Sequence, residues 1–137
     1  MSFVLDSSAT LAWVYADEMT PAVAALSTAV SETGAWVPTL WHLEIGNNLN
    51  LAVRRGRIDA DQRQKLFDQL RALNIFTDVD THTYAWTKTL RLAEQFRLTL
   101  YDACYLELAQ RRGLPLATLD GELRAAGLAL GLELLGA

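Results

Sequence analysis

Four acidic residues stand where several carboxylates can be brought to one place: Asp6, Glu44, Asp102 and Asp120. Asp6 and Asp120 directly follow short apolar runs that are typical of buried strands, and Asp102 lies in the first turn of a predicted helix. Glu44 lies inside another, mostly apolar predicted helix. Carboxylate oxygens are the ligands that hard cations such as Mg²⁺ and Mn²⁺ prefer. Together the four acids predict a site for a divalent cation.

Each acid also has an explanation that involves no chemistry. Asp6 and Asp120 are suitable N-caps for the helices that follow them, and Asp102 can complete a capping box with Thr99. Glu44 can simply face solvent. For the set as a whole this explanation is weaker, because the carboxyl ends of parallel strands meet at one crevice of an α/β sheet. Both explanations stay open at the level of sequence.

The stretch from Leu98 to Asp120 organises the chain around these acids. Thr99 is a candidate N-cap, apolar residues then follow the helical period, and Gly113 is placed to end the helix. The apolar run Pro115–Leu119 predicts a strand that is buried on both faces. Asp120 is therefore expected at the carboxyl end of that strand, where parallel sheets bind their ligands.

The rest of the chain alternates short apolar runs with segments of helical periodicity. The other predicted strands are 2–5, 35–37, 75–79 and 132–135, and the other predicted helices are 7–16 (capped by Ser7 or Ser8), 21–32, 40–55, one that opens at Asp59, 81–96 and 121–126. This alternation predicts an α/β fold of three layers, α/β/α, with a mainly parallel sheet of four or five strands.

The predicted helix 40–55 carries both an apolar stripe and a polar patch. Its inward stripe is expected to comprise Leu40, Trp41, Leu43 and Leu51. Glu44, Asn47 and Asn48 are spaced at i, i+3 and i+4, so they share one face of the helix. The helix is therefore expected to present Glu44 within a polar patch.

Composition narrows the class of protein. At 137 residues the chain is expected to form a single domain, 1–137, and 51% hydrophobic residues are too many for a disordered chain. No apolar run reaches the roughly 18 residues of a membrane span, and the N-terminus does not read as a secretory signal. One cysteine excludes an internal disulfide, so a reducing cytoplasm is expected. The net charge of −4 argues against a broad basic surface for nucleic acid.

Four segments, taken in order, resemble one family: FVLDSSATLAWV, VPTLWHLEIGNNL, LTLYDACYLELAQRRGLPLATLD and LGLELL. They are similar to the PIN-domain ribonucleases, and most of all to the VapC toxins of bacterial toxin–antitoxin pairs. The likeness covers essentially the whole chain. The motif D-S-S-A is weak alone, and the ordered set with its spacing is fairly specific.

The resemblance implies a mechanism and partners. In that family an acidic quartet, matched here by Asp6, Glu44, Asp102 and Asp120, binds one or two Mg²⁺ or Mn²⁺ ions, and water attacks an RNA phosphodiester. The hydroxyls of Ser7 and Thr118 match family positions that can orient a carboxylate or a bound water, and Asn47 matches a further recurrent position. The resemblance also implies a cognate antitoxin protein and a homodimer.

The arginines near the end of the predicted helix 40–55 have both a structural and a functional explanation. Arg54, Arg55 and Arg57 can complement the dipole of a helix end or steer RNA phosphates toward the acids. The four tryptophans are expected in the core or at an interface rather than as stacking platforms, and Cys104 as a small buried hydrophobe. His42 and His82 are given no catalytic role.

Two other functions remain in view. A PIN-like protein-interaction module would use the same acids only as caps. A phosphotransfer enzyme is disfavoured, because Asp6-Ser7-Ser8 lacks the second acid of the usual D-x-D motif.

Overall fold

Five parallel strands form the centre of the molecule. The computed structural model describes residues 1–137, the side chain of Ala16 excepted. The strands are β1 Phe3–Leu5, β2 Ala35–Pro38, β3 Ile75–Asp78, β4 Leu116–Ala117 and β5 Leu134–Leu135. Their order across the sheet is β3-β2-β1-β4-β5, and each neighbouring pair is parallel.

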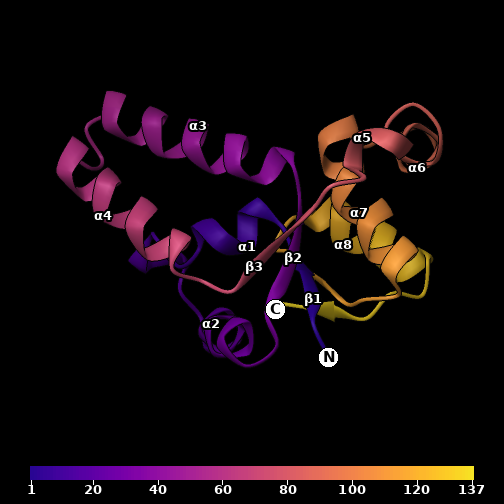
Figure 1. Ribbon diagram of the computed structural model, residues 1–137, viewed down its shortest axis with the longest axis horizontal. Coiled ribbons are helices and arrows are strands. Elements are labelled where there is room, and N and C mark those ends of the chain that lie inside the picture. The colour runs from indigo at the N-terminus through magenta and orange to yellow at the C-terminus, as the bar shows by residue number, and fades with distance from the viewer.

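Helices cover both faces of this sheet, as Figure 1 shows. They are α1 Ser7–Leu11, the 3₁₀ turn η1 Ala16–Glu18, α2 Pro21–Thr33, α3 Leu40–Arg54, α4 Ala60–Arg71, α5 Thr81–Tyr84, α6 Lys88–Phe96, α7 Leu100–Arg112 and α8 Gly121–Ala129. The chain moves outward from β1 to β3 and then returns to β4. Because parallel crossovers are right-handed, this reversal places α1–α4 on one face and α5–α8 on the other. The predicted three-layer α/β/α fold with a parallel sheet is confirmed.

The core lies between the sheet and α7. Strand β1 is buried over its whole length, and α7 is buried continuously from Ala103 to Ala109. A helix that is apolar on nearly every side packs inside a protein, and α7 contacts β1, β2 and β4 as well as α6 and α8. The helix that carries Asp102 is therefore fixed by the core on several sides.

Residue types at the helix ends account for several caps, and the helix start expected at Asp59 and the caps expected at Thr99 and Gly113 are confirmed. The side chain of Thr20 caps α2, and Asp59 with Gln62 forms a complete capping box at the start of α4. Thr99 caps α7, and Gly113 ends it in the left-handed conformation with φ of 63°. These signals depend on neighbouring residues alone, which is why the sequence reveals them.

Three details of the predicted elements are wrong. The first helix ends at Leu11 rather than at 16, and of its candidate caps Asp6 rather than Ser7 or Ser8 is the one used, because its carboxylate accepts the Ala9 amide. The predicted helix 81–96 is two helices, since the low-propensity run around Trp86 interrupts it. Leu43 is 76% exposed rather than inward, and Ile45 and Leu49 are buried with Trp41 instead. The inward stripe of α3 is thus rotated from the predicted one.

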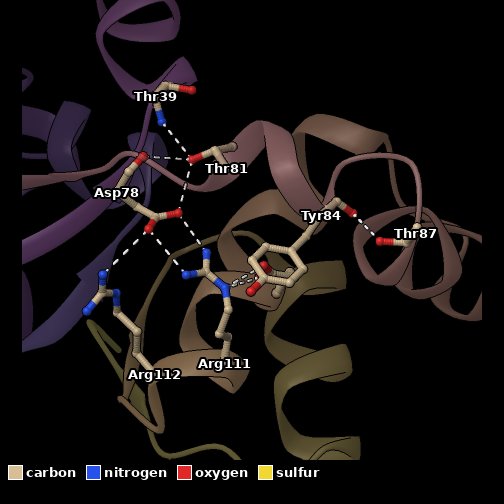
Figure 2. A network of polar contacts seen from close by, with 8 residues as sticks. Thr39, Asp78, Thr81, Tyr84, Thr87, Arg111 and Arg112 are labelled. Carbon is tan, nitrogen blue, oxygen red and sulfur yellow. Dashed lines mark hydrogen bonds and ion pairs between the residues drawn. The ribbon is translucent and has the colours of Figure 1, made fainter.

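A buried ion-pair network ties the edge strand β3 to α7 (Figure 2). Asp78 is fully buried at the end of β3, and its Oδ2 lies 2.6 Å from Arg111 Nη2. Arg111 Nε also donates to Glu107 Oε1 at 2.8 Å, and its guanidinium lies 4.6 Å from the centre of the Tyr84 ring. Thr81 donates to Asp78 as well. Every charge in the network has a partner, so the contact fixes α7 against the sheet.

No helix within the described residues is long and apolar enough to cross a membrane.

Candidate active site

The site lies where the direction of the crossovers reverses. Strands β1 and β4 are neighbours in the sheet, and the chain runs outward from them in opposite directions. In α/β folds the crevice outside the carboxyl ends of such strands is the usual ligand site. Asp6 directly follows β1, and Thr118 and Asp120 follow β4. The Thr118 hydroxyl donates to Asp6 Oδ2 at 2.6 Å, which joins the two strand ends.

The Asp6 carboxylate is buried and almost fully hydrogen-bonded. Its side chain is only 4% exposed. Oδ1 accepts the Ala9 amide at 3.0 Å and the Ser8 hydroxyl at 2.6 Å, while Oδ2 accepts Thr118. A carboxylate has about four lone-pair positions, so these three donors leave about one, on Oδ2. Asp6 is thus held in one orientation with a single open acceptor position.

Glu44 reaches the same region from helix α3. Its carboxylate is half-buried, and Oε1 accepts a short hydrogen bond of 2.5 Å from the Tyr105 hydroxyl. Tyr105 belongs to α7 and is 1% exposed. Burial is the largest cause of the raised pKa of both Glu44 and Tyr105, and a hydrogen bond from the Ser7 side chain opposes it slightly in each case. Residues from α1, α3 and α7 therefore meet at Glu44.

Asp102 and Asp120 complete the acidic set at two helix starts. Asp102 is half-buried in the first turn of α7, and its backbone amide donates to Thr99 Oγ1 at 3.1 Å. Asp120 caps α8, and its Oδ1 accepts the Leu123 amide at 3.0 Å. Asp120 is thus the predicted cap of α8, whereas only the Thr99 half of the predicted Thr99–Asp102 capping box is present; both acids also belong to the acidic group.

The four acids are coupled electrostatically. Burial is the main reason that the pKa of Asp6 rises to about 6, against the lowering effect of its donors, and the charge of Asp102 raises it further. Burial first and Asp102 second raise the pKa of Glu44. The pKa of Asp102 is itself raised by burial and then by Asp120. In the part of the chain that the structure describes, no basic side chain is among the causes of these pKa shifts.

The four acids fit a divalent cation that keeps several of its waters better than one coordinated mainly by protein side chains. Among the described side chains, no three from His, Cys, Asp and Glu are grouped closely enough to enclose one ion. Mg²⁺ usually keeps several waters and binds through one or two carboxylates, so it does not need such a group. Mutually repelling carboxylates at a sheet edge supply the oxygen donors and the uncompensated negative charge that such an ion requires.

Sequence reasoning missed two partners of the acids. The hydroxyl on Asp6 belongs to Ser8, whereas the predicted Ser7 acts on Glu44 and Tyr105. Tyr105 resembles an ordinary core residue in the sequence. Its spacing of three from Asp102 was the available signal, because residues at i and i+3 share one face of a helix.

The remaining predicted site residues are exposed: Asn47 lies one helical turn beyond Glu44 on α3, and the arginines lie farther along the chain. Asn47 is exposed and lines a shallow groove between α3 and α4 beside Asn50 and Arg63. The cluster of Arg54, Arg55 and Arg57 is exposed at the far end of α3. At 1.5 Å per residue, the ten residues from Glu44 to Arg54 span about 15 Å. These arginines can act on a ligand at the acids only through long-range attraction.

The other residues named in the sequence analysis have mostly structural roles. Trp41 is buried and donates through Nε1 to Thr10 Oγ1 at 3.0 Å, but Trp86 is 86% exposed, so it does not belong to the core. Burial raises the pKa of the Cys104 thiol to about 11, which fits an inert buried cysteine. His42 and His82 are both exposed.

The chain is similar to known proteins in sequence and in structure. The model of the family "PIN domain" matches residues 3–128. The relative Ribonuclease VapC3 from Pyrobaculum aerophilum is 33% identical over 82 residues. That alignment covers 58% of this chain and 61% of the relative, so the match spans less than two thirds of the relative's length.

Solved structures share the fold over most of the chain. The crystal structure of PAE2754 from Pyrobaculum aerophilum has a TM-score of 0.64 at 25% identity and covers 92% of this chain and 84% of the other. FitAcB from Neisseria gonorrhoeae has a TM-score of 0.65 at 14% identity and covers 98% and 96%. The sarcin–ricin loop cleaving toxin VapC20 from Mycobacterium tuberculosis has a TM-score of 0.61 at 19% identity, with 93% and 95% covered.

Proposed function

This chain belongs to the PIN domain family, and on that premise we propose that it is a Mg²⁺- or Mn²⁺-dependent endoribonuclease. We propose further that it is the toxin of a toxin–antitoxin pair and acts in the cytoplasm. The observation that carries the enzymatic proposal is the group of acids at the β1–β4 switch point, in which Asp102 is coupled to Asp6, Glu44 and Asp120. Likeness to Ribonuclease VapC3 supports RNA as the substrate.

The carboxylates and their hydrogen-bond donors would have separate roles. A bound divalent cation supplies charge neutralisation at the phosphate and activation of a water. Asp6, with its orientation fixed by Ser8 and Thr118, offers its open Oδ2 position to that ion. Glu44, Asp102 and Asp120 add carboxylates around it. We propose one or two bound ions.

Partners and assembly are proposed on the family likeness. The similarity to a toxin–antitoxin complex from Klebsiella pneumoniae has a TM-score of 0.54 and supports the fold. A cognate antitoxin protein and a homodimer are proposed, as is a single working domain over 1–137. Arg54, Arg55 and Arg57 are proposed to attract RNA from a distance, an effect that salt would screen.

Cleavage of single-stranded RNA by purified protein tests the function. Wild type should cut RNA with Mg²⁺ or Mn²⁺ and stop with EDTA. Asp6→Asn should be inactive yet folded, because asparagine caps a helix as well as aspartate does. Asp59→Asn, which makes the same change at the distant start of α4, should stay active. Cleavage that survives chelation, or survives Asp6→Asn, would overturn the metal mechanism.

The interaction-module alternative predicts a different pattern. It requires that wild type neither cuts RNA nor responds to Mn²⁺ in thermal melts. Expression in a host without antitoxin tests the toxin proposal independently. Wild type should arrest growth of the host, and Asp6→Asn should not. Equal growth of both strains would count against a toxin.

A further inference from the structure

One buried phenol contacts the acidic group without being an acid. The hydrogen bond from Tyr105 to Glu44 Oε1 joins α7 to α3 across 61 residues of sequence. Tyr105 is 1% exposed, whereas Glu44 is half-buried. The hydroxyl thus points from the core of the protein to the edge of the crevice.

The two partners differ in how firmly they are held. Tyr105 lies in the continuously buried part of α7, so its ring is fixed by packing on all sides. A glutamate side chain has one of the largest conformational freedoms of any residue. The rigid phenol therefore orders the flexible carboxylate.

The position of Tyr105 on α7 relates Glu44 to a second acid. Asp102 and Tyr105 are spaced at i and i+3, so they share one face of the helix. The same rigid helix therefore carries one carboxylate of the group and holds another through a hydrogen bond. The phenol occupies one of the roughly four acceptor positions of the Glu44 carboxylate and Ser7 a second, so about two remain open.

We propose that Tyr105 is a positioning residue that fixes the Glu44 carboxylate beside Asp102, so that its open acceptor positions are held ready for the divalent cation. This inference rests on the proposed metal-dependent function. It assigns Tyr105 no contact with the cation or the RNA. The competing role is a purely structural tie between α3 and α7.

Tyr105→Phe removes only the hydroxyl and separates the two roles. Mn²⁺ affinity of the whole protein is measured by isothermal titration calorimetry, and stability by thermal melts in EDTA. If Tyr105 positions Glu44, Tyr105→Phe should weaken Mn²⁺ binding about 10-fold or more, the usual effect of losing a group that orients a metal ligand. Tyr15→Phe is the control, since Tyr15 contacts Arg57 beyond the far end of α3. It should bind Mn²⁺ as wild type does.

A double variant tests whether Tyr105 affects Mn²⁺ binding through Glu44. If the phenol acts through Glu44, adding Tyr105→Phe to Glu44→Gln should cause no further loss of Mn²⁺ affinity. Unchanged affinity in Tyr105→Phe, with or without a lower melting temperature, would overturn the positioning role and leave the proposed function standing. A wild type that binds no Mn²⁺ would overturn both.

Fluorine NMR keeps the inference testable if Tyr105→Phe does not fold. The protein has four tyrosines, so 3-fluorotyrosine labelling of wild type gives few signals. Titration with diamagnetic Mg²⁺ should move the Tyr105 signal and leave that of Tyr15 in place. Mg²⁺ binding without movement of the Tyr105 signal would refute the inference.

Discussion

Asp102 links the acids, so neutralising it gives the most informative perturbation. Asp102→Asn preserves the start of α7, because the cap there is the bond from the backbone amide of residue 102 to Thr99. It removes a charge that raises the pKa of both Asp6 and Glu44. The metal-free variant should therefore be at least as stable as wild type, and it should lose most of its response to metal.

The expected changes in stability follow from the interactions of Asp102 with the other three acids. Asp102 is coupled to Asp6, Glu44 and Asp120, and like-charge neighbours cost about 0.2–0.5 kcal/mol each, so relief amounts to about 0.6–1.5 kcal/mol. With an unfolding entropy near 0.29 kcal/mol/K for 137 residues, the melting temperature in EDTA should rise by about 2–5 °C. Mn²⁺ at about 100 times its dissociation constant should stabilise wild type by about 2.7 kcal/mol, or about 9 °C.

Thermal melts of both proteins in EDTA and in excess Mn²⁺ measure these shifts. Asp59→Asn is the matched control, because it makes the same charge change at a helix start outside the acidic group. It should keep the full Mn²⁺ shift. A destabilised Asp102→Asn beside a wild type that ignores Mn²⁺ would show that Asp102 is only a helix-start residue. That result would refute the catalytic reading of the four acids.

Three further outcomes are expected. Asp78→Asn removes the charge that Arg111 contacts through both Nη atoms but leaves the Arg111–Glu107 pair, so it should cost about 1.5–3 kcal/mol and lower the melting temperature by about 5–10 °C; a loss under about 0.5 kcal/mol would contradict this. The pKa of Asp6 is raised from 3.8 to about 6, so the folded metal-free protein binds this proton more tightly than the unfolded chain does. Its stability should therefore increase by up to about 3 kcal/mol as pH falls from 7 to 4, relative to Asp6→Asn in urea titrations, and parallel profiles would disprove it. Cys104, with a buried thiol whose pKa is raised to about 11, should resist iodoacetamide until the protein unfolds, as mass spectrometry can follow.

Features that depend on a few neighbouring residues were predictable. The strand–helix alternation predicted the fold class, and the helix starts at Asp59 and Thr99 were recognised from adjacent residue types. The placement of Asp6 and Asp120 beyond neighbouring strand ends followed from the rule for parallel sheets. Each of these inferences needs only periodicity, cap chemistry or topology.

Features that depend on tertiary packing were not predictable. Leu43 fits the helical period of α3, yet the face that meets the sheet is set by how the whole helix docks, and Leu43 lies outside it. The choice between Ser7 and Ser8 as the donor to Asp6 depends on a single turn of a five-residue helix. The Asp78–Arg111 pair joins residues 33 apart, which no local pattern specifies.

The bond between Asp6 and Thr118 also determines when the site can form. The two residues are 112 positions apart in the chain. During synthesis the N-terminal part emerges first, and contacts between distant residues form late because a long loop must close. A nascent chain that has not reached β4 contains Asp6 without its Thr118 donor and contains no Asp120. We therefore expect the cation site to assemble only after β4 and the start of α8 have been synthesised, so that a shorter nascent chain carries no complete site.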